Sequence, residues 1–191
     1  ATALMNSLKL NNAVLIGHSM GGVVALQLAT EQEASVSGLI LSSTHLGFGC
    51  PKGAALMPRY ADRIERMISK GVDIAYGRER AKRSTPPETS EAVIEFLAKI
   101  AAGSRAEGIR NGGRMSQEAD NAEICSKISV PVLILSGEKD TVIPSNMHSD
   151  LIAALPEALQ YVFPNAGHAS YAEYPNIFNK WVKDFALNSL K

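Results

Sequence analysis

The sequence predicts an α/β protein in which helices flank a parallel sheet and a helical segment is inserted between two of the strands. Short, continuous apolar runs recur along the chain with helical patterns between them, and residues 46–127 contain no convincing strand. The chain has 191 residues, of which 46% are hydrophobic and 20% charged, the composition of a globular protein with a sizeable core.

Four apolar runs are expected to form the strands. Runs of this kind, short and almost without polar interruption, are typical of strands buried on both faces of a parallel sheet. They cover residues 13–16, 38–42, 131–135 and, most weakly, 160–163. Parallel strands need crossover connections, so helices are expected between these runs.

The helical patterns lie where those crossovers require them. A helix is expected over about 23–29 and another over about 145–155, directly before the last strand. The chain ends on an amphipathic pattern in which Ile177, Trp181 and Phe185 recur at three- and four-residue spacing.

The middle of the chain has the pattern of a helical insertion. One apolar stripe at helical spacing consists of Leu56, Tyr60, Ile64, Met67 and Ile68, and a second of Val93, Ile94, Leu97 and Ile100. The residues Thr-Pro-Pro-Glu at 85–88 are typical of a helix start, with proline just inside it and an acid three residues after the threonine. We therefore expect a core segment at 1–45, a helical cap insertion at 46–127 and a second core segment at 128–191.

The pentapeptide Gly-His-Ser-Met-Gly at 17–21 stands between the first predicted strand and the first helix. This is the context of a nucleophile elbow, a strained turn that lifts a serine hydroxyl above the edge of the sheet. The turn requires small residues two before and two after Ser19, and both Gly17 and Gly21 meet that need. Gly22 is expected to let the helix pack closely.

A serine nucleophile needs a base, and the base needs an acid that orients it. Asp140 follows the third predicted strand and His168 the fourth, so both loops reach the sheet edge that carries Ser19. The chain order Ser, Asp, His is the order expected for this elbow. Glu138 is a rival for the acid, and His18 is expected to be a packing or substrate-pocket residue, because neighbouring side chains on such a turn point apart.

On these residues the chain resembles the α/β-hydrolase-fold serine hydrolases, from Leu10 to the C-terminus. It is most similar to small esterases, enol-lactonases and carbon–carbon bond hydrolases, with residues 14–22, 130–144 and 164–175 carrying the resemblance and the middle corresponding to the variable cap. The resemblance implies Ser19 as nucleophile, His168 as general base and acid, Asp140 as the residue that holds the imidazole, and the Met20 backbone N–H as one oxyanion donor.

The resemblance also implies structure in front of the first strand. Members of the family have several strands before the elbow, and a loop there supplies the second oxyanion donor, often in a His-Gly motif. Only about ten residues precede the elbow strand here, and they look like the tail of a helix. The expectation is that this chain is the C-terminal portion of a longer hydrolase, or that a partner chain supplies the first half of the fold.

Charge and composition narrow the classes of partner. Nineteen basic residues balance nineteen acidic ones, so no global field favours nucleic acid or an anionic membrane. The resemblance to serine hydrolases instead implies a small-molecule ester or lactone as the partner. No apolar run approaches the ~20 residues of a membrane span, and the first residues of the sequence lack the charged start and apolar stretch of a signal peptide. The expectation is a cytoplasmic protein, with a lost N-terminal signal left open.

No metal or organic cofactor is expected. The four histidines are scattered and none has a carboxylate or cysteine at ligand spacing. His45 and His148 are expected to be surface or loop histidines. Cys50 and Cys125 are expected to be free thiols, since the chain carries no secretory features.

Arginines and lysines are concentrated between residues 59 and 83, a segment that contains eight basic residues and four acidic ones. They are either a solvated helix face or a source of one or two arginines that reach over the pocket and bind a substrate carboxylate.

Together these features predict a serine hydrolase that cleaves a carboxylic ester or lactone through an acyl-enzyme. A carbon–carbon bond hydrolase or thioesterase on the same fold, and a non-catalytic binding homologue, remain open alternatives.

Overall fold

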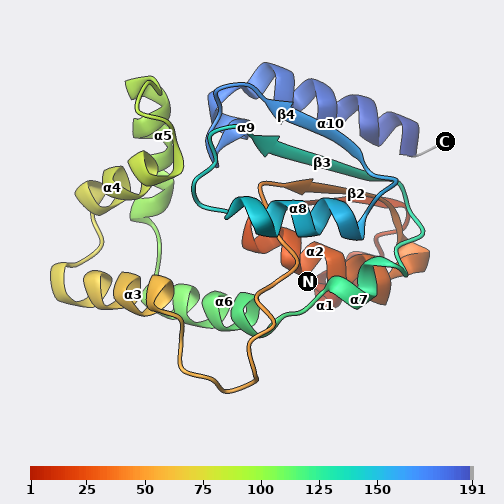
Figure 1. Ribbon diagram of the computed structural model, residues 1–191, viewed down its shortest axis with the longest axis horizontal. Coiled ribbons are helices and arrows are strands. Elements are labelled where there is room, and N and C mark those ends of the chain that lie inside the picture. Colours follow the sequence, from red (N-terminus) through yellow and green to blue (C-terminus); the bar gives the residue numbers. More distant parts are fainter. Residues whose placement is uncertain (190–191) are drawn as a thin grey trace.

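The structure is a computed structural model that describes residues 1–189 (Figure 1). Its elements, in chain order, are α1 (Thr2–Ser7), β1 (Ala13–His18), α2 (Met20–Glu31), η1 (Glu33–Ser35), β2 (Val36–Ser42), α3 (Pro58–Lys70), α4 (Ile74–Ser84), α5 (Glu91–Ala102), α6 (Ala106–Glu118), α7 (Ala122–Cys125), β3 (Val132–Gly137), α8 (Ser145–Ala154), β4 (Leu159–Phe163), α9 (Ser170–Glu173) and α10 (Pro175–Ser189).

The four strands form one parallel sheet in the order β1-β2-β3-β4, which confirms the predicted fold class. Helix α10 covers one face, and α2 and α8 cover the other (Figure 1). Because all four strands run in the same direction, the segments that follow β1, β2, β3 and β4 all start at the carboxyl ends of the strands. These segments therefore lie close together along that side of the sheet.

The alternation of side chains along the two central strands divides the core in two. Leu39 and Leu41 of β2 are fully buried on the side of α2 and α8, whereas Ile40 is fully buried on the side of α10. In β3, Ile134 joins the first cluster and Leu133 the second. This period of two is what a strand covered by helices on both faces requires.

The expectation that the first strand is buried on both faces is wrong in one respect. β1 lies at an edge of the described sheet, and Ile16 is 53% exposed. A continuous apolar run therefore did not distinguish a central strand from one at the edge. β4 lies at the opposite edge, where Leu159 is 59% exposed and Phe163 is buried.

The middle of the chain is helical, as predicted, and its helices α4 and α5 pair with each other, as do α3 and α6. These helices lie to one side of the sheet (Figure 1). Helix α7, at the end of the segment, instead contacts α2 and α8. The division of the chain at residues 46 and 127 stays a prediction.

Two details of the helical prediction are wrong. Ile68 and Ile100 belong to the predicted apolar stripes but are 68% and 58% exposed. The helix expected to begin at Thr85 begins instead at Glu91. Thr85 is extended, as residues before proline usually are, and its hydroxyl donates to Ala81 O at the end of α4. Within residues 1–189, no helix has the length and apolar character needed to cross a membrane.

Candidate active site

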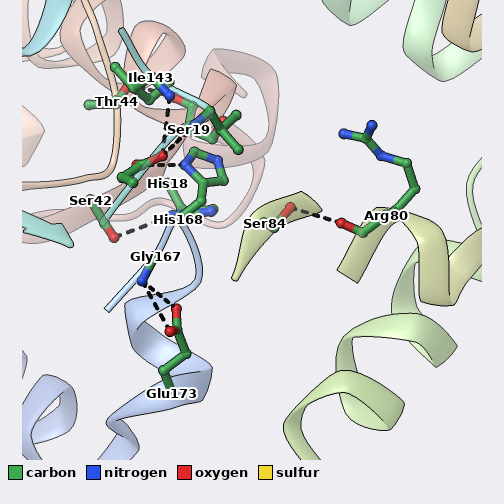
Figure 2. A network of polar contacts seen from close by, with 12 residues as sticks. His18, Ser19, Ser42, Thr44, Arg80, Ser84, Ile143, Gly167, His168 and Glu173 are labelled. Atoms are coloured by element: carbon green, nitrogen blue, oxygen red, sulfur yellow. Dashed lines mark hydrogen bonds and ion pairs between the residues drawn. The ribbon is translucent and has the colours of Figure 1, made fainter. Parts of the chain in front are cut away.

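Ser19 lies at the sharp turn between β1 and α2 (Figure 2). Its φ of 52° and ψ of −124° are outside the conformations that a serine ordinarily adopts, so the turn is strained. Two hydrogen bonds hold it: Ser19 N donates to Ser42 O at 2.9 Å, and Thr44 Oγ1 donates to Ser19 O at 2.5 Å. The strained strand-to-helix geometry is that of a nucleophile elbow.

Close packing around the turn confirms the predicted need for glycine at two of the three positions, Gly17 and Gly22. A Cβ at Gly17 would lie 2.5 Å from Gly22 Cα, so this position cannot accept a side chain without movement of the backbone. A Cβ at Gly22 would lie 2.3 Å from Thr44 Oγ1. A Cβ at Gly21 would meet no neighbouring atom of residues 1–189 within 4 Å, so the expected steric requirement there is wrong.

Met20 is the first residue of α2. Backbone N–H groups in the first turn of a helix have no partner inside the helix, and the helix dipole favours negative charge beside them. The Met20 N–H is therefore placed, next to Ser19, where it can donate to an oxyanion. Its role stays a prediction.

His168 and Asp140, which are 28 residues apart, are in contact in the structure. His168 Nδ1 lies 2.9 Å from Asp140 Oδ2, and each side chain is only 9% exposed. The other carboxylate oxygen of Asp140 accepts from the backbone N–H groups of Val142 at 2.8 Å and Ile143 at 3.2 Å. With a proton on Nδ1 shared with Asp140, Nε2 of His168 is free to accept one.

The environment keeps Asp140 ionised. Burial by itself would raise the pKa of this carboxyl, but the hydrogen bond from His168 and those from Val142 and Ile143 outweigh burial, and the pKa lies below its ordinary value. Asp140 is thus a fixed negative charge beside the imidazole, which is what stabilises an imidazolium.

Ser19 and His168 line the same cavity, which has a volume of about 550 Å³. Among residues 1–189 the Ser19 hydroxyl makes no hydrogen bond to His168. Such bonds are often long in the absence of substrate and tighten when it binds. The apolar side of this cavity is formed by Leu97, Ile100 and Ile109 from the helices α5 and α6.

Glu138, the rival acid, is placed away from the imidazole. Its Oε2 accepts from the backbone N–H of Asn165 at 2.9 Å, so it holds the loop after β4. Geometry therefore brings Asp140, and not Glu138, to His168.

His18 lines the catalytic cavity, and its ring lies 4.8 Å from that of His168 and 4.9 Å from that of Tyr171. Its Nδ1 lies 3.3 Å from Ser42 Oγ. Burial, followed by the charge of His168, lowers the pKa of His18 to about 4. His18 is thus neutral near pH 7 and adds no positive charge beside the base.

The prediction of a surface or loop position is confirmed for His45 and is wrong for His148. His45 follows β2 in a loop, although it is only 3% exposed and lines the catalytic cavity. Its Nδ1 accepts from Gly47 N at 3.0 Å, and burial lowers its pKa to about 4. His148 is half-buried in α8, and burial lowers its pKa as well. Their surroundings come from elements distant in sequence, so local pattern gave no sign of burial.

Several residues that support the site were missed in the sequence analysis. The Glu173 carboxylate accepts from the backbone N–H of Gly167 with both oxygens, each at 3.0 Å, directly before His168 (Figure 2). Tyr171 contacts Phe178 of α10 and also lines the catalytic cavity. No local sequence signal points to these contacts.

No group of three or more His, Cys, Asp or Glu side chains able to hold a metal is found within residues 1–189. Cys50 and Cys125 are free thiols.

Solved structures with the same fold include esterases and a lactonase. An esterase from Thermogutta terrifontis superposes with a TM-score of 0.82 at 24% identity, covering 98% of this chain and 70% of the esterase. The enol-lactonase from Burkholderia xenovorans superposes with a TM-score of 0.80 at 24% identity, covering 96% of this chain and 69% of the lactonase. At this identity the similarity establishes the fold.

Sequence comparison agrees with the structural one. The chain is 26% identical over 183 residues to the pimeloyl-(acyl-carrier protein) methyl ester esterase of Yersinia pseudotuberculosis, with 94% of this chain and 71% of the esterase covered. The sequence profile of the alpha/beta hydrolase fold family matches residues 1–175. The strained serine turn, the parallel sheet and this match together show that the chain belongs to the alpha/beta hydrolase fold family.

Proposed function

We propose that this protein is a serine hydrolase that cleaves a carboxylic ester or a lactone through an acyl-enzyme. The observation that carries the proposal is the 2.9 Å contact between His168 and Asp140 beside the cavity that His168 shares with Ser19. The same class of reaction is supported by the comparisons: one relative in sequence is a methyl ester esterase, and structures of the same fold include esterases and an enol-lactonase.

The first half of the reaction acylates the enzyme. Ser19 Oγ attacks the substrate carbonyl carbon while its proton passes to His168 Nε2, and the carbonyl oxygen becomes an oxyanion within reach of the Met20 N–H. The intermediate then collapses, the bond to the alcohol oxygen breaks, and His168 returns the proton to that oxygen. The negative Asp140 stabilises the imidazolium between the two proton transfers.

The second half releases the acid. His168 Nε2 accepts a proton from a water molecule, and the water oxygen attacks the acyl carbon. When this intermediate collapses, the proton passes from His168 to Ser19 Oγ, and the carboxylic acid leaves. With a lactone the alcohol and the acid are parts of one molecule, so the product is a hydroxy acid.

A fluorophosphonate probe tests the nucleophile. We expect it to label the protein at Ser19, and we expect Ser19→Ala to abolish both the labelling and the hydrolysis of para-nitrophenyl esters. Ser37, a half-buried serine of β2 outside the cavity, gives the matched control Ser37→Ala, which should label as the unaltered protein does. Labelling that persists in Ser19→Ala would overturn the proposal.

The alternatives give different results in the same experiments. A non-catalytic binding homologue would bind esters without being labelled. A carbon–carbon bond hydrolase or a thioesterase would be labelled at Ser19 but would turn over diketones or thioesters faster than the matching oxygen esters.

A further inference from the structure

A second cavity, of about 980 Å³, lies beside the catalytic one and shares Arg59, Arg63, Arg80 and Val142 with it. Seven basic residues line this outer cavity, against two acidic ones, Asp62 and Glu79. The catalytic cavity itself is lined by three arginines and, among residues 1–189, by no aspartate or glutamate. Its two unreactive histidines, His18 and His45, are neutral near pH 7, so the positive charge comes from the arginines.

Several of the other basic side chains are engaged by protein groups. Arg66 Nε lies 3.5 Å from Glu79 Oε2, and Lys139 Nζ lies 3.8 Å from a carboxylate oxygen of Glu88. The Arg59 guanidinium lies over aromatic rings, 5.4 Å from the centre of Phe48. These contacts account for much of the outer basic surface without any ligand.

Arg80 is different, because its guanidinium makes no hydrogen bond or ion pair within the described part of the chain. Figure 2 shows the side chain leaving α4 with no contact drawn at its charged end. The group is half-buried, and burial together with the charge of Arg63 lowers its pKa to about 10. A cation removed from water without a counter-charge is unfavourable, and an anion placed beside it relieves that cost.

Arg63 is held in position next to the same space. Its Nε donates to Tyr76 Oη at 2.7 Å, and Tyr76 is fully buried. Among residues 1–189 the terminal NH₂ groups of Arg63 make no hydrogen bond or ion pair, so they are available to a ligand. The contact with Tyr76 also reduces the freedom that the side chain would lose on binding.

The helix that carries Arg80 is tied to the catalytic histidine. Ser84, at the end of α4, accepts from the backbone N–H of His168 at 2.8 Å, and its hydroxyl donates to Arg80 O at 3.1 Å (Figure 2). The backbone of Arg80 is therefore fixed relative to the reacting groups, and its side chain starts from a defined point beside the catalytic cavity.

We propose that Arg80 and Arg63 bind a carboxylate carried by the substrate itself, so that this enzyme acts on monoesters of dicarboxylic acids or on lactones that bear a carboxylate. Guanidinium groups match carboxylates through paired hydrogen bonds. The apolar wall of Leu97, Ile100 and Ile109 would contact the carbon chain between the two ends. This inference rests on the proposed ester hydrolysis, which places the other end of the substrate at Ser19.

The kinetic test compares charged and neutral substrates of equal length. Mono-para-nitrophenyl esters of glutaric, adipic and suberic acids are measured beside the para-nitrophenyl esters of the matching monocarboxylic acids. We expect Arg80→Gln to raise KM about 10- to 100-fold for the acidic ester of best-fitting length, and to change KM for the neutral ester by less than about twofold. Arg83→Gln is the matched control: it removes the same charge one turn along α4, outside the catalytic cavity, and should leave both values within about twofold.

Binding is measured separately from turnover. Monomethyl adipate is titrated into Ser19→Ala and into Ser19→Ala/Arg80→Gln, with methyl hexanoate as the neutral probe. We expect the second change to weaken binding of the acidic ester by a similar factor and to spare the neutral ester. If Arg80→Gln changed the turnover of acidic and neutral esters equally, the inference would be overturned but the proposed ester hydrolysis would stand. Binding of the acidic ester without any turnover would instead contradict the proposed function.

Discussion

The elbow contains a pair of adjacent glycines that differ in their surroundings. Gly21 and Gly22 are both in the first turn of α2, but only Gly22 faces a neighbour among residues 1–189. A Cβ there would lie 2.3 Å from Thr44 Oγ1 and 2.5 Å from Thr44 Cγ2. Because carbon atoms pack best at about 3.5–4.0 Å, Thr44 or the helix would have to move by about 1 Å. The hydroxyl that would move is the one that donates to Ser19 O.

These distances give an expected loss of stability. Overpacking of this kind costs about 1–3 kcal/mol, and loss of the Thr44 hydrogen bond about 0.5–1.5 kcal/mol. The better helix propensity of alanine offsets about 1 kcal/mol. We therefore expect Gly22→Ala to lower the free energy of unfolding by about 1–3 kcal/mol, a fall in Tm of about 2–12 °C for a chain of this size. Gly21→Ala should be neutral or stabilising by up to about 1 kcal/mol.

Thermal unfolding followed by circular dichroism measures both variants, and para-nitrophenyl ester hydrolysis reports on the turn itself. Gly22→Ala should also lose activity, because displacement of Thr44 releases the strained carbonyl of Ser19. The double variant Thr44→Gly/Gly22→Ala removes the clashing atoms and should lose less stability than the sum of the two single changes. If Gly22→Ala proves as stable as Gly21→Ala, the steric argument fails.

Three further predictions follow from contacts at the site. Asp140→Asn should lower kcat about 10⁴-fold, the effect of the equivalent change in a serine protease. Glu138→Gln keeps an oxygen that can accept from Asn165 and should change kcat by less than about twofold. Equal losses in the two variants would contradict the assignment of the acid. The folded pKa of His45, about 4, lies below its unfolded value of 6.5, so the stability that its neutral form contributes is present above about pH 6.5 and is lost as the pH falls toward 4. In urea unfolding, the loss of unfolding free energy between about pH 7 and about pH 4.5 should be smaller in His45→Asn by about 2 kcal/mol. An equal loss in both proteins would argue against a buried neutral imidazole. Glu173→Ala should lower the free energy of unfolding in urea by about 1–3 kcal/mol, and Glu173→Gln should lower it less, because only the alanine leaves the buried N–H of Gly167 without an acceptor. No loss in Glu173→Ala would show that water replaces the carboxylate.

The strands and the serine turn were predictable because their signals are local. Residues 13–16, 38–42 and 160–163 each lie within a strand of the sheet, and residues 131–135 overlap β3, which begins at Val132. An apolar run reports burial through its own side chains, and a glycine-flanked serine between a strand and a helix specifies its own backbone conformation. Local signals also misled: the Thr-Pro-Pro-Glu pattern resembles a helix start, yet the proline after Thr85 keeps that residue extended.

The sequence alone determined the class of the fold, the position of the strained serine and the chain order of the three candidate catalytic residues. Tertiary structure decided which carboxylate lies beside His168, that His45 is buried against the cavity, that Gly22 and not Gly21 lacks room for a side chain, and that the Arg80 guanidinium has no polar partner among the described residues. The reason is physical: burial, steric contact and charge pairing depend on side chains from elements far apart in the sequence, and only packing places those side chains together.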